Sequence, residues 1–326
     1  VHHPIALTPT PGGPDRDGCF SGGAGVHNGV PTVIYHGGPE GTCLATSQDD
    51  LLIRWTKHPA NPVITPKKVA GDFRVYDPCA WQMGDSWYAL CGGLDPAGGD
   101  TAFLFKSPDL CRWEYLHPFY QSDRRWTEVD EDCAVPDFFP LGNKHMLLFC
   151  SHLQGTQYYL GRLDGERFQP ETHGRMSWPG GLLGGAITLL DARQRRIYFD
   201  WIRELRGHPW ERESGWSGVM TLPRILSLGA DGTLRIEPVP ELEVLRYHPR
   251  QHQNVQLGAS SEKILEDVQG ECLELALEIE PGAAGRCGVR LRCSPDGAEQ
   301  TVVACAPAAK KPAIEMGKSS LDPRIR

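Results

Sequence analysis

A strand–turn–strand pattern returns four times along this chain and restricts its fold more than any other feature. Each copy begins with small or acidic residues, continues as a short apolar segment, turns tightly, and returns as a second apolar segment. The copies cover residues 21–35, 77–90, 136–149 and 185–199. Repeats of roughly 50 to 65 residues, each with about four strands, are typical of a β-propeller. A β-sandwich is the alternative, but its turns would come without this long period.

A second repeat interleaves with the first. The segment Ser47–Asp50 leads to Trp55, and sixty residues later Ser107–Leu110 leads to Trp113. Weaker copies occur at residues 163–168 and 228–234. Each copy fits a polar turn before an outer strand. No sustained helical period occurs in this region, so the sequence predicts an all-β propeller here.

The repeats stop near residue 246, and a different pattern follows. Leu273, Leu275, Leu277 and Ile279 alternate with acidic and other residues, which predicts a half-buried strand. A turn at 294–297 then leads into a further apolar segment. We therefore expect a propeller domain over residues 1–246 and a second, partial all-β domain over 247–326.

Composition excludes several classes of protein. The 326 residues carry a net charge of -8, with 40% apolar residues and 23% charged residues, so a folded core is expected and a nucleic-acid partner is not. No apolar run approaches the ~18 residues of a membrane span. No metal-binding spacing occurs, and we expect neither a metal nor a cofactor.

The eleven cysteines include no CxxC pair and are expected to be mostly buried free thiols. Neither compartment nor oligomeric state is indicated.

Two acidic stretches are candidates for chemistry. Residues 130–137 hold four carboxylates beside an apolar segment, and crowding of this kind keeps at least one acid protonated near neutral pH. Upstream, Arg74 lies close to Asp77, and a neighbouring guanidinium keeps an acid ionised. One neutral and one charged carboxylate are what glycoside hydrolysis requires. Loop acids that cap strand ends are the alternative interpretation.

The order of several blocks resembles glycoside hydrolase family 32, which contains invertases, inulinases, levanases and related β-fructosidases. The blocks are residues 4–9 with 17–22, Arg74 with Asp77-Pro78, Glu131–Asp137, and 218–224. The resemblance implies a five-bladed propeller followed by a β-sandwich. It also implies retaining hydrolysis of a small carbohydrate, sucrose or a fructan such as a fructo-oligosaccharide.

The chain departs from the family pattern in three places. Val75-Tyr76 separate Arg74 from Asp77, and Glu131 lies five residues before Pro136 where the family usually has two. The family's nucleophile is the aspartate of an Asn-Asp-Pro-Asn-Gly block, and no such block occurs in this sequence. We therefore expect four blades, with the first blade and the end of the sandwich lacking. A natural four-bladed protein, or a sugar-binding propeller without catalysis, is the alternative.

The resemblance also implies roles for individual residues. Glu131 would be the acid/base, with Asp132 as the alternative because the insertion shifts the alignment. Asp77 would hold the fructosyl hydroxyls and stabilise the transition state, and Arg74 would orient it. Phe20 and Ser21 would contact the substrate, with Asp132 beside them. From their places in the sequence rather than from the resemblance, Trp201 is a candidate for stacking on sugar and Asp137 is expected to be a buried hydrogen-bond acceptor.

Overall fold

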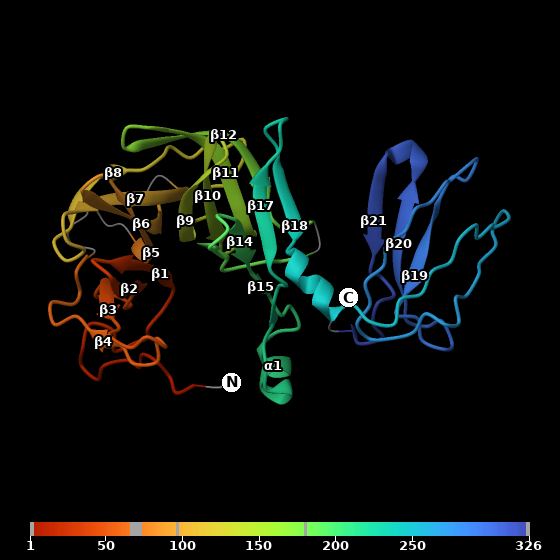
Figure 1. Ribbon diagram of the computed structural model, residues 1–326, viewed down its shortest axis with the longest axis horizontal. Helices are drawn as coiled ribbons and strands as arrows, with labels where there is room; N and C mark the ends of the chain where they lie inside the picture. Colours follow the sequence, from red (N-terminus) through yellow and green to blue (C-terminus); the bar gives the residue numbers. More distant parts are fainter. Residues whose placement is uncertain (1–2, 66–73, 96–97, 179–180, 324–326) are drawn as a thin grey trace. The chain divides into compact units, whose positions relative to one another are not determined.

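The computed structural model describes residues 3–65, 74–95, 98–178 and 181–323 (Figure 1). Three four-stranded antiparallel sheets follow one another along the chain. The first contains β1 (Gly22–His27), β2 (Val30–His36), β3 (Thr42–Thr46) and β4 (Thr56–Lys57); the second β5 (Arg74–Met83), β6 (Ser86–Leu94), β7 (Asp100–Ser107) and β8 (Glu114–Pro118); the third β9 (Ala134–Leu141), β10 (Lys144–Ser151), β11 (Gly155–Asp164) and β12 (Arg167–Arg175).

The fourth sheet has an insertion in its middle. It contains β13 (Ile187–Leu190), β14 (Arg196–Phe199), β17 (Arg224–Leu228) and β18 (Leu234–Pro238). Between β14 and β17 the chain forms the short hairpin of β15 (Trp201–Ile202) and β16 (Val219–Met220), which carries α1 (His208–Ser214). The predicted propeller architecture is confirmed, with four sheets that correspond to blades.

The tight turns form where the sequence predicts them. Asn28 and Gly29 both have positive φ, 50° and 79°, and connect β1 to β2. Two-residue hairpins of this kind need left-handed backbone at both positions, which Asn-Gly tolerates best. The predicted turns at Gly84-Asp85 and Gly142-Asn143 likewise connect paired strands.

Apolar clusters fill the space between neighbouring sheets. Phe103 and Phe105 of the second sheet pack with Ile34 of the first, and Leu104 packs with Phe138 and Leu147 of the third. A third cluster joins Met146 and Leu160 to Tyr198 of the fourth sheet. The first strands of neighbouring sheets also lie together, since β1 contacts β5, β5 contacts β9, and β9 contacts β13. These four first strands, β1, β5, β9 and β13, are here called the inner ring.

All eleven cysteines are free, as predicted, but only four of them are buried. The buried ones are Cys43, Cys91, Cys133 and Cys150, and Cys272 and Cys293 are exposed. No helix in the described residues is both long and apolar enough to span a membrane.

The chain divides into two compact units, one of residues 1–203 with 217–239, the other of 204–216 with 240–326. The second contains a short 3-10 helix at Pro240–Leu245, another at Pro307–Ala309, and a three-stranded antiparallel sheet of β19 (Cys287–Leu291), β20 (Thr301–Ala306) and β21 (Lys311–Glu315). The turn at 294–297 connects β19 to β20.

The strand predicted over 273–279 is wrong: its four apolar side chains are 41–54% exposed, and the segment joins no sheet. Alternation predicts a two-faced strand but supplies no neighbouring strand to pair with. The domain boundary at residue 246 stays a prediction.

Candidate active site

Two β-bulges bring the acidic stretches together at one end of the inner ring. Asp77 is the extra residue of β5, between the pairs Tyr76–Gly92 and Pro78–Cys91. The register of β9 also shifts near its start, opposite Leu148 and Cys150. Asp77 and Val135 both have positive φ, 47° and 46°, and the Val135 N–H lies 3.4 Å from Asp77 Oδ2. Bulges with strained backbone re-aim side chains and are common beside functional sites.

Asp132 is held by donors from two other elements. His152, which follows β10, donates from its backbone N to Oδ1 at 2.9 Å, and its Nδ1 lies 2.6 Å from Oδ2. The Tyr76 hydroxyl donates to the same Oδ2 at 2.5 Å. The Asp132 side chain is 10% exposed and that of His152 is 71% exposed. The imidazole therefore covers a nearly buried carboxylate.

The surroundings move the pKa values of Asp77 and Asp132 in opposite directions. Burial raises the pKa of Asp77 to about 6, and the charge of Asp132 adds to the rise, while the Val135 N–H and His152 oppose it. Burial also acts to raise the pKa of Asp132, but hydrogen bonds from His152 and Tyr76 outweigh it and lower the value. Neighbouring carboxyls with separated pKa values are the arrangement that acid–base chemistry uses.

Arg74 opens β5, but its side chain lies outside the described part of the chain. Its predicted ion pair with Asp77 stays a prediction. Among the described groups, burial is the main cause that drives the carboxyl of Asp77 toward its neutral form, and the expected effect of Arg74 on it stays a prediction as well.

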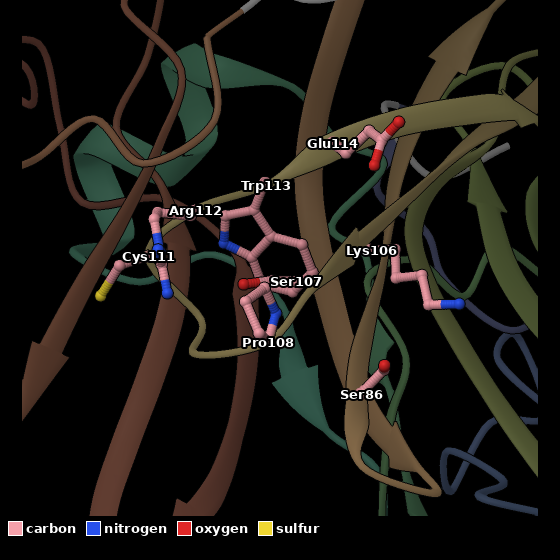
Figure 2. Close-up of a pocket in the computed structure, with 8 residues that line it drawn as sticks. All are labelled: Ser86, Lys106, Ser107, Pro108, Cys111, Arg112, Trp113 and Glu114. Atoms are coloured by element: carbon pink, nitrogen blue, oxygen red, sulfur yellow. The ribbon is translucent and has the colours of Figure 1, made fainter.

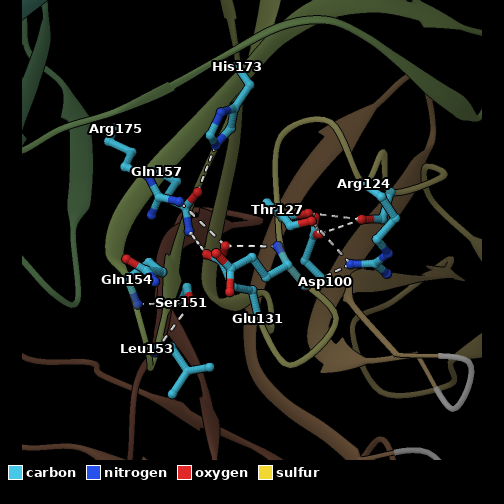
Figure 3. Close-up of polar contacts among 12 residues, drawn as sticks. Asp100, Arg124, Thr127, Glu131, Ser151, Leu153, Gln154, Gln157, His173 and Arg175 are labelled. Carbon is cyan, nitrogen blue, oxygen red and sulfur yellow. Dashed lines mark hydrogen bonds and ion pairs between the residues drawn. The ribbon is translucent and has the colours of Figure 1, made fainter.

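Glu131 belongs to a separate, fully buried network (Figure 3). One of its carboxylate oxygens accepts hydrogen bonds from Glu128 N at 3.0 Å and from Arg175 Nη2 at 3.4 Å. The other accepts from Gln157 Nε2, whose Oε1 lies 2.7 Å from His173 Nε2. Glu131 is 0% exposed, so its described contacts are with protein donors on the β11–β12 side rather than with the Asp77–Asp132 end.

The sequence analysis missed a network around Asp100. This buried carboxylate accepts hydrogen bonds from Tyr120, Tyr159, Ser122 and Thr127, at 2.5–2.8 Å. Within the same segment, Arg124 donates a hydrogen bond of 2.7 Å to the Glu128 carbonyl oxygen (Figure 3). Asp100 thereby anchors the loop that ends at the acids 130–132. The run of hydroxyl side chains after β8 was the only available signal.

A row of rings connects Phe20 with the Asp132 pair. Ring centroids are 5.7 Å apart for Phe20 and His36, 6.4 Å for His36 and Tyr76, and 6.3 Å for Tyr76 and His152. Burial lowers the pKa of His36, whose Nδ1 has no hydrogen-bond partner in the part of the chain that the structure describes. His36, Tyr76 and His152 were all missed by sequence reasoning. Ser21 lies next to this row, where its backbone oxygen accepts from His36 N at 2.9 Å.

Trp201 is connected to the Asp77–Asp132 end of the inner ring by Arg203, which contacts both Trp201 and His152. The guanidinium of Arg203 lies 5.7 Å from the Trp201 ring centroid, and its Nη1 lies 3.4 Å from the His152 carbonyl oxygen. Trp201 is 41% exposed, so it is available for contact with a ligand. Asp137 accepts hydrogen bonds from Thr188 N and Oγ1 at 2.9 and 2.6 Å, as expected of an acceptor, but it is half-buried rather than buried.

A hollow of about 460 Å³ lies elsewhere, over the outer strands of the second sheet (Figure 2). It is lined by Lys106, Ser107, Trp113 and Glu114, among others, and by none of the candidate site residues. Among the described residues, no group of three or more His, Cys, Asp or Glu side chains is placed to hold a metal ion. The acidic end of the inner ring is therefore the better candidate site.

The fold and this carboxylate cluster define a β-propeller protein followed by a smaller β-sheet unit. Two family models match nearly the whole chain: the glycosyl hydrolases family 32 N-terminal domain over residues 1–238 and the family 32 C-terminal domain over 241–324. The chain belongs to glycosyl hydrolases family 32, as its sequence blocks predicted.

Curated relatives agree with this assignment, and a solved structure agrees with the fold. A sucrose-6-phosphate hydrolase from Escherichia coli is 32% identical over 304 residues, 85% of this chain and 60% of that protein. A fructan 1-exohydrolase from Triticum aestivum is 28% identical over 85% of this chain and 51% of its own length. The crystal structure of a fructan 1-exohydrolase from Cichorium intybus in complex with 1-kestose matches the fold with a TM-score of 0.78 at 24% identity, over 100% of this chain and 73% of that one. The chain spans about 60% of the length of the sucrose-6-phosphate hydrolases that it matches.

Proposed function

We propose that this chain forms the site of a β-fructofuranosidase, a glycosidase that releases fructose from sucrose or a fructan. The observation that carries the proposal is the pair of carboxyls at one end of the inner ring, Asp77 and Asp132, whose pKa values are driven apart. Family membership supports it, as do relatives named as hydrolases of sucrose 6-phosphate and of fructans.

The mechanism we propose is the retaining one. A carboxylate attacks the anomeric carbon, a second carboxyl protonates the leaving oxygen, and the second then activates water. The printed sequence contains no Asn-Asp-Pro block. We propose that the attacking carboxylate comes from such a block outside these 326 residues, and that Asp77 stabilises charge on the fructosyl unit in the transition state.

Two residues that are adjacent in the sequence, Glu131 and Asp132, are the candidates for the acid/base. Glu131 is the sequence prediction, but it is buried and saturated by Gln157, Arg175 and the Glu128 N–H. Asp132 shares its surroundings with Asp77 and lies under an exposed imidazole. An acid/base must come within hydrogen-bond reach of the leaving oxygen, so we infer Asp132 from its place beside Asp77. Because hydrogen bonds from His152 and Tyr76 lower its pKa, only the protonated minority of Asp132 would act as the acid.

Fructose release tests the proposal directly. The 326-residue chain and the same protein with its upstream coding sequence are compared at equal concentration on sucrose, sucrose 6-phosphate and inulin. We expect release by the longer chain and none by the shorter one, because loss of one member of a catalytic set leaves only a residual rate. Turnover by the short chain would mean that an acid already present is the nucleophile. Sugar binding without release by either chain would support the alternative, a non-catalytic sugar-binding propeller.

A further inference from the structure

His152 is an exposed imidazole with one edge fixed by a nearly buried carboxylate. Its Nδ1 lies 2.6 Å from Asp132 Oδ2, and its backbone N donates to Oδ1 of the same side chain at 2.9 Å. The other edge of the ring faces outward, since the side chain is 71% exposed. A carboxylate that takes Nδ1–H fixes the orientation of the ring and leaves Nε2 for a ligand.

The turn that carries His152 is also fixed. Ser151 is fully buried, and its Oγ accepts hydrogen bonds from the N–H groups of Leu153 and Gln154, at 3.3 and 3.2 Å (Figure 3). On the other side, Arg203 reaches the His152 carbonyl. Because both main chain and side chain are already ordered, a ligand bound by this ring would not lose affinity to ordering it.

We propose that His152 is a sugar-binding residue of this site, with Nε2 donating a hydrogen bond to an oxygen of the bound fructoside. The inference rests on the proposed function and adds a residue that none of the sequence blocks contains. No described residue accepts a hydrogen bond from Nε2 of His152, so the nitrogen is open to a ligand. The ring also lies next to Tyr76 in the row that leads to Phe20, on the side where substrate contacts were predicted.

The charges that face the ring set the direction of its pH dependence. The hydrogen bond from His152 to Asp132 is the main cause that raises the pKa of His152; Asp77 also raises it, while burial and Arg203 lower it. Tyr76 faces the ring as a neutral phenol, since its own pKa is well above its ordinary range. The protonated ring therefore persists to higher pH than an ordinary histidine. A charged donor binds a sugar oxygen more strongly than a neutral ring, so binding should weaken as pH rises through the pKa of His152.

The test measures fructose binding, so it does not depend on turnover. The dissociation constant of fructose for the 326-residue chain is determined by calorimetry at about pH 5 and about pH 8, on either side of the usual histidine range. The variants are His152→Gln, which retains a neutral donor, and His208→Gln as the matched control. His208 is likewise exposed and lies 2.7 Å from a carboxylate, Glu211, but in α1 of the second unit. NMR resonances of the imidazole nitrogens, in protein labelled at histidine, report directly on the His152 ring.

We expect wild type to bind fructose about tenfold more tightly at the lower pH, the order of effect for a charged hydrogen bond. His152→Gln should lose this difference, and His208→Gln should keep it. Added fructose should shift the His152 Nε2 resonance. Binding by wild type with no pH dependence, or an unchanged pH dependence in folded His152→Gln, would overturn the inference and leave the proposed function standing. No fructose binding by wild type at either pH would contradict the proposed function as well.

Discussion

At the residue scale, the site depends on two carboxyls whose pKa values are shifted in opposite directions by their surroundings. Asp77 and Asp132 are alike in the sequence, but among the described residues Asp132 receives three hydrogen bonds and Asp77 receives one, from Val135. Tyr76 and Asp132 are 56 residues apart, and His152 lies 20 residues beyond Asp132. Crowded acids predict that some pKa values will shift, but which acid keeps its proton depends on such distant donors. The sequence therefore predicted the acidic stretches and missed Tyr76 and His152.

The raised pKa of Asp77 predicts a cost to stability that an amide would remove. In the unfolded chain Asp77 ionises near its ordinary pKa of 3.8, and burial raises its pKa in the folded chain to about 6. Stability from this group is thus complete below about pH 4 and decreases as pH rises toward about 6. The difference of about two pKa units corresponds to as much as ~3 kcal/mol. We expect Asp77→Asn to gain stability over wild type in urea unfolding at pH 7, and no such gain at pH 4. An equal effect at both pH values would contradict the raised pKa.

At the element scale, β5 and β9 show what the sequence can and cannot determine. Their apolar residues and turns identify both strands, and the turns at Gly84-Asp85 and Gly142-Asn143 match the expectation. The bulges could not be predicted, because an extra residue in one strand is defined only against its neighbour. The segment 273–279 shows the same limit, since its alternation is clear but no partner strand pairs with it.

The bulge of β9 can be tested at Val135. A β-branched residue with positive φ is strained by roughly 1–3 kcal/mol, and glycine removes this strain while adding about 0.5–1 kcal/mol of chain entropy. We expect Val135→Gly to leave the free energy of unfolding unchanged or to raise it by about 1 kcal/mol. The control is Val26→Gly in β1, which is exposed and has ordinary strand backbone, and which should destabilise by about 1 kcal/mol. Equal destabilisation by the two variants in urea would mean that Val135 is unstrained.

At the scale of the whole molecule, the two compact units and the two family models divide the chain at nearly the same place. The first model ends at residue 238 and the second begins at 241, while the repeat pattern places the boundary at 246. Four sheets could be predicted because each repeat carries its own turn and apolar strands. The three-stranded sheet of the second unit has no repeat to support such a prediction.

Limited proteolysis tests the boundary. Val239 is buried, whereas Pro240, Arg246 and Tyr247 are exposed at the start of the second unit. We expect trypsin to cut first after Arg246 or Arg250, since exposed chain between compact units is cleaved before ordered sheets. Mass spectrometry of the fragments identifies the site, and Arg246→Gln should move the first cut to Arg250. An initial cut within β5 to β12 would contradict the division.

The proposed function depends on which acid reaches the substrate. The most direct test compares the kcat of Asp132→Asn with the kcat of Glu131→Gln. Both are measured on sucrose in the fructose-releasing chain. We predict that Asp132→Asn lowers kcat by ~10²–10⁴-fold, the usual contribution of a general acid. Glu131→Gln should keep kcat within a few fold, but lose about 1–3 kcal/mol of stability because Arg175 and Gln157 lose a buried anionic partner. A large loss of kcat in Glu131→Gln with near-normal turnover by Asp132→Asn would contradict this account and restore Glu131 as the acid/base.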